Sequence, residues 1–307
     1  MTPPGGRGHD GRRVGTGTCA GVPVELDVHV AGPEDPAAEV VLLVEGLGMQ
    51  RVDWPAELLA GLHAAGYRTL TMDNRDAGRS TVLPGRVHDL PRGADGWPVP
   101  PYGLADLADD LVAVLDAVGV AEAHVVGRSM GGMVAQHLAL AHAERVRSLT
   151  SLMSTTGARD VGQVHEDAKW VLTTPPPTDD LDAYLAYVLA KEEAVGSPGH
   201  VDPEVVRRRA TLTWQRGVHP HGTARQLLAV RADGDRTDRL ADVTAPTLVV
   251  HGDRDPLIDV SGGHATAKAV PDARLEVVDG MGHDLPAAFV EQAVLPLLLD
   301  HLAASAV

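Results

Sequence analysis

The chain has 307 residues, 44% of them apolar and 22% charged, as expected for a globular protein, and 26 basic against 42 acidic residues give a formal net charge of −16. A surface this acidic repels phosphate backbones and anionic lipid, which argues against a nucleic-acid or membrane partner. The single cysteine, Cys19, cannot form an internal disulfide, the N-terminus has no apolar stretch typical of a secretory signal, and no apolar run reaches the ~18 residues that span a bilayer. We therefore expect a cytoplasmic protein.

The predicted elements begin after a Gly-, Pro- and Arg-rich segment, residues 1–14, which is expected to form a flexible tail. Residues 22–30 alternate apolar and polar side chains, a pattern typical of an antiparallel edge strand with one solvated face. Continuous apolar runs then predict strands buried on both faces, at 40–44, 68–72, 124–126, 146–152, 247–250 and 275–278.

Helical patterns separate these strands, at 54–65, 104–118, 130–142, 265–270 and 287–303. Alternating strands and helices predict an α/β fold with a mostly parallel central sheet and helices on both faces. Residues 84–101 interrupt this alternation with a Pro/Gly-rich loop.

A longer interruption covers residues 155–242, which hold helical patterns at 179–194, 203–216 and 223–232 and no convincing strand. An insertion between two core strands predicts a helical cap over the carboxyl ends of the strands, where open α/β sheets bind ligands. The expected domains are therefore a core of residues 15–154 and 243–307 and a cap of residues 155–242.

The main chemical signal is the motif Gly127-Arg128-Ser129-Met130-Gly131, which follows a buried strand and opens a helix. This strand–turn–helix context is the one that a nucleophile elbow requires, because the turn is too sharp for side chains at the flanking positions. Ser129 is then presented at the edge of the sheet, where the helix N-terminus favours developing negative charge.

A serine nucleophile needs a base and an acid, and both candidates lie in loops after later strands. The acid lies in the loop after residues 247–250, where Asp253 and Asp255 are both candidates. Asp255 is preferred because it lies further out on the loop and precedes Pro256, whereas Asp253 is expected to bond backbone N–H groups of the turn. The base is His283, in the glycine-containing loop between the last strand and the last helix.

Acyl transfer also requires an oxyanion hole. One predicted donor is the backbone N–H of Met130, and the second is that of Leu47 in the glycine-rich loop after residues 40–44. No residue pattern requires a metal or an organic cofactor: His219 and His221 are spaced like paired zinc ligands but lack a third partner, and Gly46 and Gly48 lack the rest of a dinucleotide-binding motif.

These motifs resemble the α/β-hydrolase superfamily, and most closely its aclacinomycin methylesterase-like esterases. The similarity includes Trp54-Pro55, the segment from Asp73 to Ser80, and Ser129-Met130-Gly131 at the elbow. The resemblance implies that Ser129, Asp255 and His283 form the catalytic triad, that Leu47 and Met130 form the oxyanion hole, and that bulky polyketide esters are one substrate class.

One departure from the family pattern is Glu45-Gly46, where many members have His-Gly. A carboxylate that faced the oxyanion hole would oppose the developing charge, so Glu45 is expected to turn away and bond backbone or an arginine, with Arg128 as one candidate. In the helix predicted at 179–194, Leu181, Tyr184, Leu185 and Val188 are interpreted mainly as packing within the cap, with lining of the acyl pocket as the alternative.

The function predicted is that of a serine hydrolase that cleaves a small-molecule carboxylic ester or lactone through an acyl-enzyme, without a cofactor. Two alternatives stay open. One is a cofactor-free C–C hydrolase or perhydrolase with the same triad, and the other is a ligand-binding protein on a hydrolase scaffold without turnover. The sequence makes no prediction about the oligomeric state.

Overall fold

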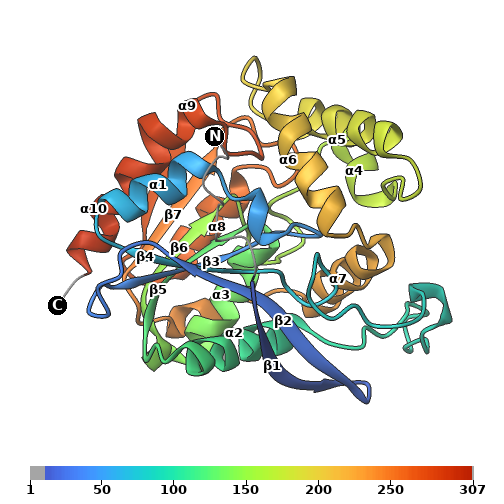
Figure 1. The fold of residues 1–307 in the computed structure, drawn as a ribbon, viewed down its shortest axis with the longest axis horizontal. Helices are drawn as coiled ribbons and strands as arrows, with labels where there is room; N and C mark the ends of the chain where they lie inside the picture. The colour runs from blue at the N-terminus through green and yellow to red at the C-terminus, as the bar shows by residue number, and fades with distance from the viewer. Residues whose placement is uncertain (1–10, 306–307) are drawn as a thin grey trace, which may run out of the picture.

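A computed structural model describes residues 11–305, and in this part of the chain eight strands form one sheet in the order β1-β2-β4-β3-β5-β6-β7-β8 (Figure 1). Their bounds are β1 (Arg12–Cys19), β2 (Val22–Ala31), β3 (Val40–Val44), β4 (Arg68–Met72), β5 (Ala123–Arg128), β6 (Val146–Leu152), β7 (Thr247–Gly252) and β8 (Arg274–Val278). The pairs β1–β2 and β2–β4 are antiparallel, and all pairs from β4 to β8 are parallel. The predicted mostly parallel sheet is confirmed.

Helices cover both faces of the sheet (Figure 1). One face carries α1 (Ala56–Ala64) and the C-terminal helix, in which α9 (Ala287–Phe289), a π-helical turn (Val290–Val294) and α10 (Leu295–Ala304) follow one another directly. The other face carries α2 (Leu104–Val118), α3 (Met130–Ala141) and α8 (Ser261–Ala269). Short 3-10 turns lie at Arg51–Asp53, Val87–Asp89, Ala143–Arg145, Glu166–Ala168 and Arg239–Asp242.

Strand β3 shows why the sequences of the central strands are unbroken apolar runs. Val41 and Leu43 pack with Leu58 and Leu62 of α1, whereas Val40, Leu42 and Val44 belong to the cluster on the opposite face. Successive side chains of a strand point to opposite faces, so a strand covered on both sides needs apolar residues at every position.

The N-terminal prediction needs correction. Arg12, Arg13 and Val14 pair with β2, so the predicted flexible tail 1–14 extends too far, and its residues 1–10 lie outside the described part of the chain. β1 is consequently the edge strand, and the predicted edge strand β2 lies one position inside. Gly15 and Gly17 flank a register shift and weaken the alternation in β1, although Val14 is buried as in a regular strand.

Residues 155–242, named here the helical insert, contain α4 (Trp170–Thr173), α5 (Leu181–Val195), α6 (Pro203–Arg216) and α7 (Pro220–Asp233). In Figure 1 these helices lie beyond one end of the sheet. Local chemistry sets their starts: the Asp180 side chain accepts from the N–H of Ala183, and that of Asp202 accepts from the N–H of Glu204 before Pro203 opens α6.

One stretch of the described residues, Ala287–Ala304, has the length and mean hydropathy (1.3 over 18 residues) of a helix that could cross a membrane. Glu291 and Asp300 interrupt this stretch, so it is not a continuous apolar run. Val290, Val294, Leu298 and Leu302 of this stretch are buried against the sheet, which is the packing of a core helix.

Candidate active site

Ser129 lies at a sharp turn between β5 and α3, with φ 55° and ψ −123°, a conformation that side chains rarely adopt. The two glycines of the motif are required by close contacts. A Cβ at Gly127 would lie 2.2 Å from the carbonyl oxygen of Gly131, and a Cβ at Gly131 would lie 2.1 Å from that of Val44. The turn therefore has the geometry of a nucleophile elbow.

The structure brings Ser129, His283 and Asp255 together at the carboxyl ends of β5, β7 and β8. His283 Nε2 lies 3.0 Å from Ser129 Oγ, and His283 Nδ1 lies 2.6 Å from Asp255 Oδ2. An ionised carboxylate only accepts hydrogen bonds, so Nδ1 carries the proton and Nε2 accepts from the serine hydroxyl. The ends of parallel strands meet at one edge of a sheet, which is why residues so distant in sequence converge here.

Asp255 is held in place from several sides. Its Oδ1 accepts from the N–H groups of Leu257 (2.8 Å) and Ile258 (2.9 Å), and the residue is 3% exposed. Burial by itself raises the pKa of this carboxyl, but electrostatic attraction to His283 and hydrogen bonds from His251 and His283 outweigh burial and hold the pKa well below its usual range. Asp255 is therefore ionised at neutral pH.

Asp253, the alternative acid, has a different environment. Its Oδ1 accepts from the N–H of Gly280 at 2.7 Å, as expected for a turn carboxylate. His283 therefore forms its hydrogen bond with Asp255, the preferred acid, and not with Asp253.

His251 is a residue of this site that the sequence analysis did not identify. It is fully buried at the end of β7, its Nε2 lies 2.7 Å from the carbonyl oxygen of Ile258, and the same nitrogen lies 3.4 Å from Asp255 Oδ2. The available signal was its position four residues before Asp255, at the start of the same loop. His251 fixes the loop that carries the acid.

The predicted oxyanion donors, the N–H groups of Leu47 and Met130, differ in hydrogen bonding from the N–H groups on either side of Leu47. The N–H of Gly46 is bonded by the Glu45 side chain and that of Gly48 by Gln226, at 3.2 and 2.8 Å. No hydrogen bond to the N–H of Leu47 or Met130 is made within the described residues. Gly46 and Ser129 are close neighbours, because a Cβ at Gly46 would lie 3.3 Å from Ser129 Cβ.

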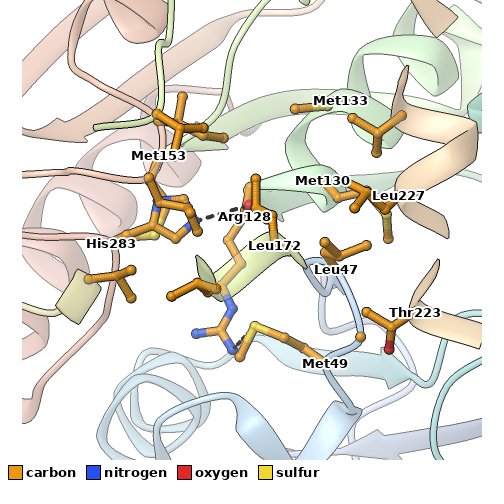
Figure 2. Close-up of a pocket in the computed structure, with 18 of the residues that line it drawn as sticks. Leu47, Met49, Arg128, Met130, Met133, Met153, Leu172, Thr223, Leu227 and His283 are labelled. Carbon is orange, nitrogen blue, oxygen red and sulfur yellow. Dashed lines mark hydrogen bonds between the residues drawn. The ribbon is translucent and has the colours of Figure 1, made fainter. Parts of the chain in front are cut away.

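Glu45 pairs with Arg128, as expected from the sequence. Arg128 Nε lies 2.7 Å from Glu45 Oε2, and both side chains are buried. The arginine also lies over Trp54, with 5.0 Å between its Cζ and the ring centroid, and Figure 2 shows it extending toward Met49. Burial raises the pKa of Glu45 to about 7, although Arg128 opposes the shift.

A cavity of about 980 Å³ contains Ser129 and His283 and is lined by residues of both the core and the helical insert. Figure 2 shows Met130, Met133 and Leu227 on one side of it, across from His283 and Met153. From the predicted packing face of α5, Tyr184 and Val188 line the cavity and Leu181 and Leu185 do not. Tyr184 also packs on Trp214 of α6, so its side chain has both predicted roles.

His219 lines the same cavity but is not placed as a metal ligand. Its Nε2 donates to the carbonyl oxygen of Gly78 at 2.9 Å, and His221 is exposed. Within residues 11–305, no three His, Cys, Asp or Glu side chains are grouped to hold a metal ion.

Comparison with known proteins gives consistent matches. The family model described as the α/β hydrolase fold matches residues 39–286. A rhodomycin D methylesterase of Streptomyces sp. (strain C5) is 30% identical, with 92% of this chain and 97% of the relative covered. A putative carbamate hydrolase of Variovorax paradoxus is 32% identical, with 85% and 90% covered.

Solved structures match over nearly the whole chain. A thermophilic esterase from Thermogutta terrifontis superposes with a TM-score of 0.71 at 22% identity, covering 96% of this chain and 99% of the esterase. An enol-lactonase from Burkholderia xenovorans gives 0.70 at 22% identity, with 93% and 98% covered. At these identities the structural matches concern the fold alone.

Proposed function

This chain belongs to the α/β-hydrolase family, and from that premise we propose that it is a serine esterase that hydrolyses small-molecule carboxylic esters. The observation that carries the proposal is the chain of hydrogen bonds from Ser129 through His283 to Asp255 inside the cavity. The names of the methylesterase relatives support the choice of an ester bond.

In the proposed reaction, Ser129 Oγ attacks the ester carbonyl while His283 Nε2 takes its proton. Asp255, ionised and fixed by its loop, orients His283 and stabilises the imidazolium. His283 then protonates the departing alkoxide, which leaves an acyl group on Ser129. The same nitrogen next takes a proton from water, and the resulting attack on the acyl-enzyme releases the acid.

The oxyanion is assigned to the N–H groups of Leu47 and Met130. Their lack of an acceptor among the described residues supports this assignment, and so does the position of Met130 at the first turn of α3. The Glu45 carboxylate is held by Arg128 and Gly46, which keeps its charge compensated beside the hole.

Residues 155–242 are a cap on a core that comprises residues 12–154 and 243–305, because insert and core together line the cavity. The protein acts in the cytoplasm, with which its single cysteine is compatible.

The test is turnover of a short-chain p-nitrophenyl ester by the wild type and by Ser129→Ala, with circular dichroism to check folding. Removal of the nucleophile should lower kcat by about 10⁴-fold or more. A fluorophosphonate should label the wild type at Ser129 and leave the variant unlabelled.

Several results would contradict the proposal. A Ser129→Ala variant with wild-type turnover would exclude the assigned nucleophile. A folded wild type that neither turns over esters nor takes the label would favour a binding protein. Cleavage of a C–C bond in preference to all esters would move the function to the C–C hydrolases. Preferential transfer of the acyl group to hydrogen peroxide, which forms a peracid, would move it to the perhydrolases.

A further inference from the structure

One wall of the cavity carries a set of charged side chains that the proposed reaction does not use. Helix α5 contributes Tyr184, Val188, Lys191 and Val195 to the lining, at intervals of three and four residues. This spacing places them on one face of the helix. Lys191 and its neighbour Glu192 are the charged residues of that face.

The other charged groups of this wall have partners. Arg128 lies 2.7 Å from Glu45, and Arg209 of α6 lies 2.7 Å from Glu192. The third carboxylate, Asp53, accepts from the hydroxyl of Thr213 (3.0 Å) and from the N–H of Gln50 (2.8 Å).

Lys191 differs from these groups. Within the described residues its ammonium makes no hydrogen bond and no ion pair shorter than 4.0 Å. Burial lowers the pKa of Lys191, and the charges of Glu192 and Asp53 oppose this shift only partly. Both carboxylates also have other partners. An anion brought by a ligand would supply the missing partner.

The position of Lys191 connects it to the reacting groups. Val195, one helical turn further along α5, accepts the backbone N–H of His283 at 2.7 Å. The four residues from Lys191 to Val195 rise about 6 Å along the helix axis. Helix α5 therefore carries Lys191 and also holds the backbone of the catalytic histidine, and both residues line the same cavity.

The side of the cavity across from His283 carries the apolar side chains of Met130, Met133 and Leu227 (Figure 2). A ligand suited to both sides combines an apolar portion with one anionic end. Arg128 and Arg209 are each held by a carboxylate, so attraction for such an end comes from direct contact with Lys191.

We propose that Lys191 is a substrate-recognition residue that selects esters bearing a second, carboxylate group several bonds from the scissile bond. This inference rests on the proposed esterase function and specifies its substrate class. A charge-assisted hydrogen bond in a partly desolvated site discriminates about tenfold or more against an uncharged analogue.

The test compares monomethyl adipate with methyl hexanoate, which differ only in a terminal carboxylate or methyl group. The quantity measured is the ratio of kcat/KM for the two esters, from methanol release. Lys191→Met should lower this ratio about tenfold or more, whereas Lys191→Arg, which keeps the charge, should largely retain it. Lys191→Glu should favour methyl 6-aminohexanoate over monomethyl adipate.

An unchanged ratio in Lys191→Met would overturn the inference while methyl hexanoate turnover keeps the esterase function intact. If Lys191→Met does not fold, Lys191→Gln gives the same comparison with a neutral polar end. A wild type that hydrolyses no ester and takes no fluorophosphonate would instead overturn the proposed function, and this inference with it.

Discussion

At the scale of single residues, Glu45 has the most unusual environment near the candidate site. It follows β3 directly, is fully buried and pairs with Arg128, yet burial still raises its pKa to about 7. The folded protein therefore holds a proton on Glu45 at pH values where the unfolded chain, with a pKa near 4.5, has released it.

This shift predicts a pH-dependent stability. Between pH 4.5 and 7 the folded state binds more protons than the unfolded state, so the contribution of Glu45 to the free energy of unfolding falls as the pH rises. The total fall is on the order of 3 kcal/mol. Urea unfolding should therefore show that the free energy of unfolding of Glu45→Gln, relative to that of the wild type, is higher at pH 8 than at pH 5 by about 3 kcal/mol.

The matched control is Glu144→Gln, because Glu144 is exposed in a surface turn. This variant should change equally little at both pH values. A difference between wild type and Glu45→Gln that does not depend on pH would contradict the elevated pKa.

At the scale of elements, the end of α5 and the loop of His283 are joined by a compact set of bonds. Val195 accepts the N–H of His283, Ser197 Oγ accepts from the N–H of Gly282 at 2.9 Å, and Asp284 accepts from the N–H and hydroxyl of Ser197. The helical insert thus fixes the backbone on both sides of the catalytic base. Any displacement of α5 would be transmitted to His283.

Ser197→Ala should therefore lower kcat about tenfold with little change in KM, because the backbone of the base loses support while the apolar side of the cavity stays intact. The rate of fluorophosphonate labelling of Ser129 should fall in parallel. Ser197→Thr, which keeps the hydroxyl, should recover part of both.

Ser305→Ala serves as the control for Ser197→Ala, since among the described residues the Ser305 hydroxyl bonds only the carbonyl of His301 in its own helix. Its kinetics should match the wild type. A Ser197→Ala variant that raises KM and leaves kcat and labelling unchanged would assign this serine to substrate binding instead.

At the scale of the whole molecule, buried ion pairs connect the helical insert to the core. Arg225 of α7 lies 2.7 Å from Asp76, and Arg216 of α6 lies 2.7 Å from Asp27 and 2.6 Å from Asp73. All of these side chains are buried. Such pairs add little stability over apolar packing, but loss of one partner leaves a buried charge unpaired.

Arg225→Met should accordingly lower the free energy of unfolding by about 3–5 kcal/mol, because the Asp76 carboxylate then keeps only Tyr102 and the N–H of Leu83 as donors among the described residues. Urea denaturation gives this value. The exposed pair Lys169–Glu166 provides the comparison, and Lys169→Met should change the stability by no more than about 1 kcal/mol. Equal effects of the two variants would refute a fastening role for Arg225.

The sequence by itself determined the features that depend on local patterns. The central strands, the helices between them and α6 followed from runs, periodicity and caps, and the Ser129 motif followed from its two glycines. The order of strand ends also placed Asp255 and His283 near Ser129, since parallel strands bring their carboxyl ends to one edge. β1 was missed because Gly15 and Gly17 obscure its alternation.

Only the tertiary structure decided the contacts between distant segments. Whether Asp253 or Asp255 reaches His283 depends on how the loop after β7 folds back, and His251 takes part because it is buried at the end of β7, beside that loop. Among the described residues, Arg209 has a carboxylate partner and Lys191 has none, and this difference depends on how α5 packs against α6. Such pairings join residues far apart in the chain. The free energy of each polar or charged contact depends on how deeply its groups are buried, which local sequence patterns do not encode.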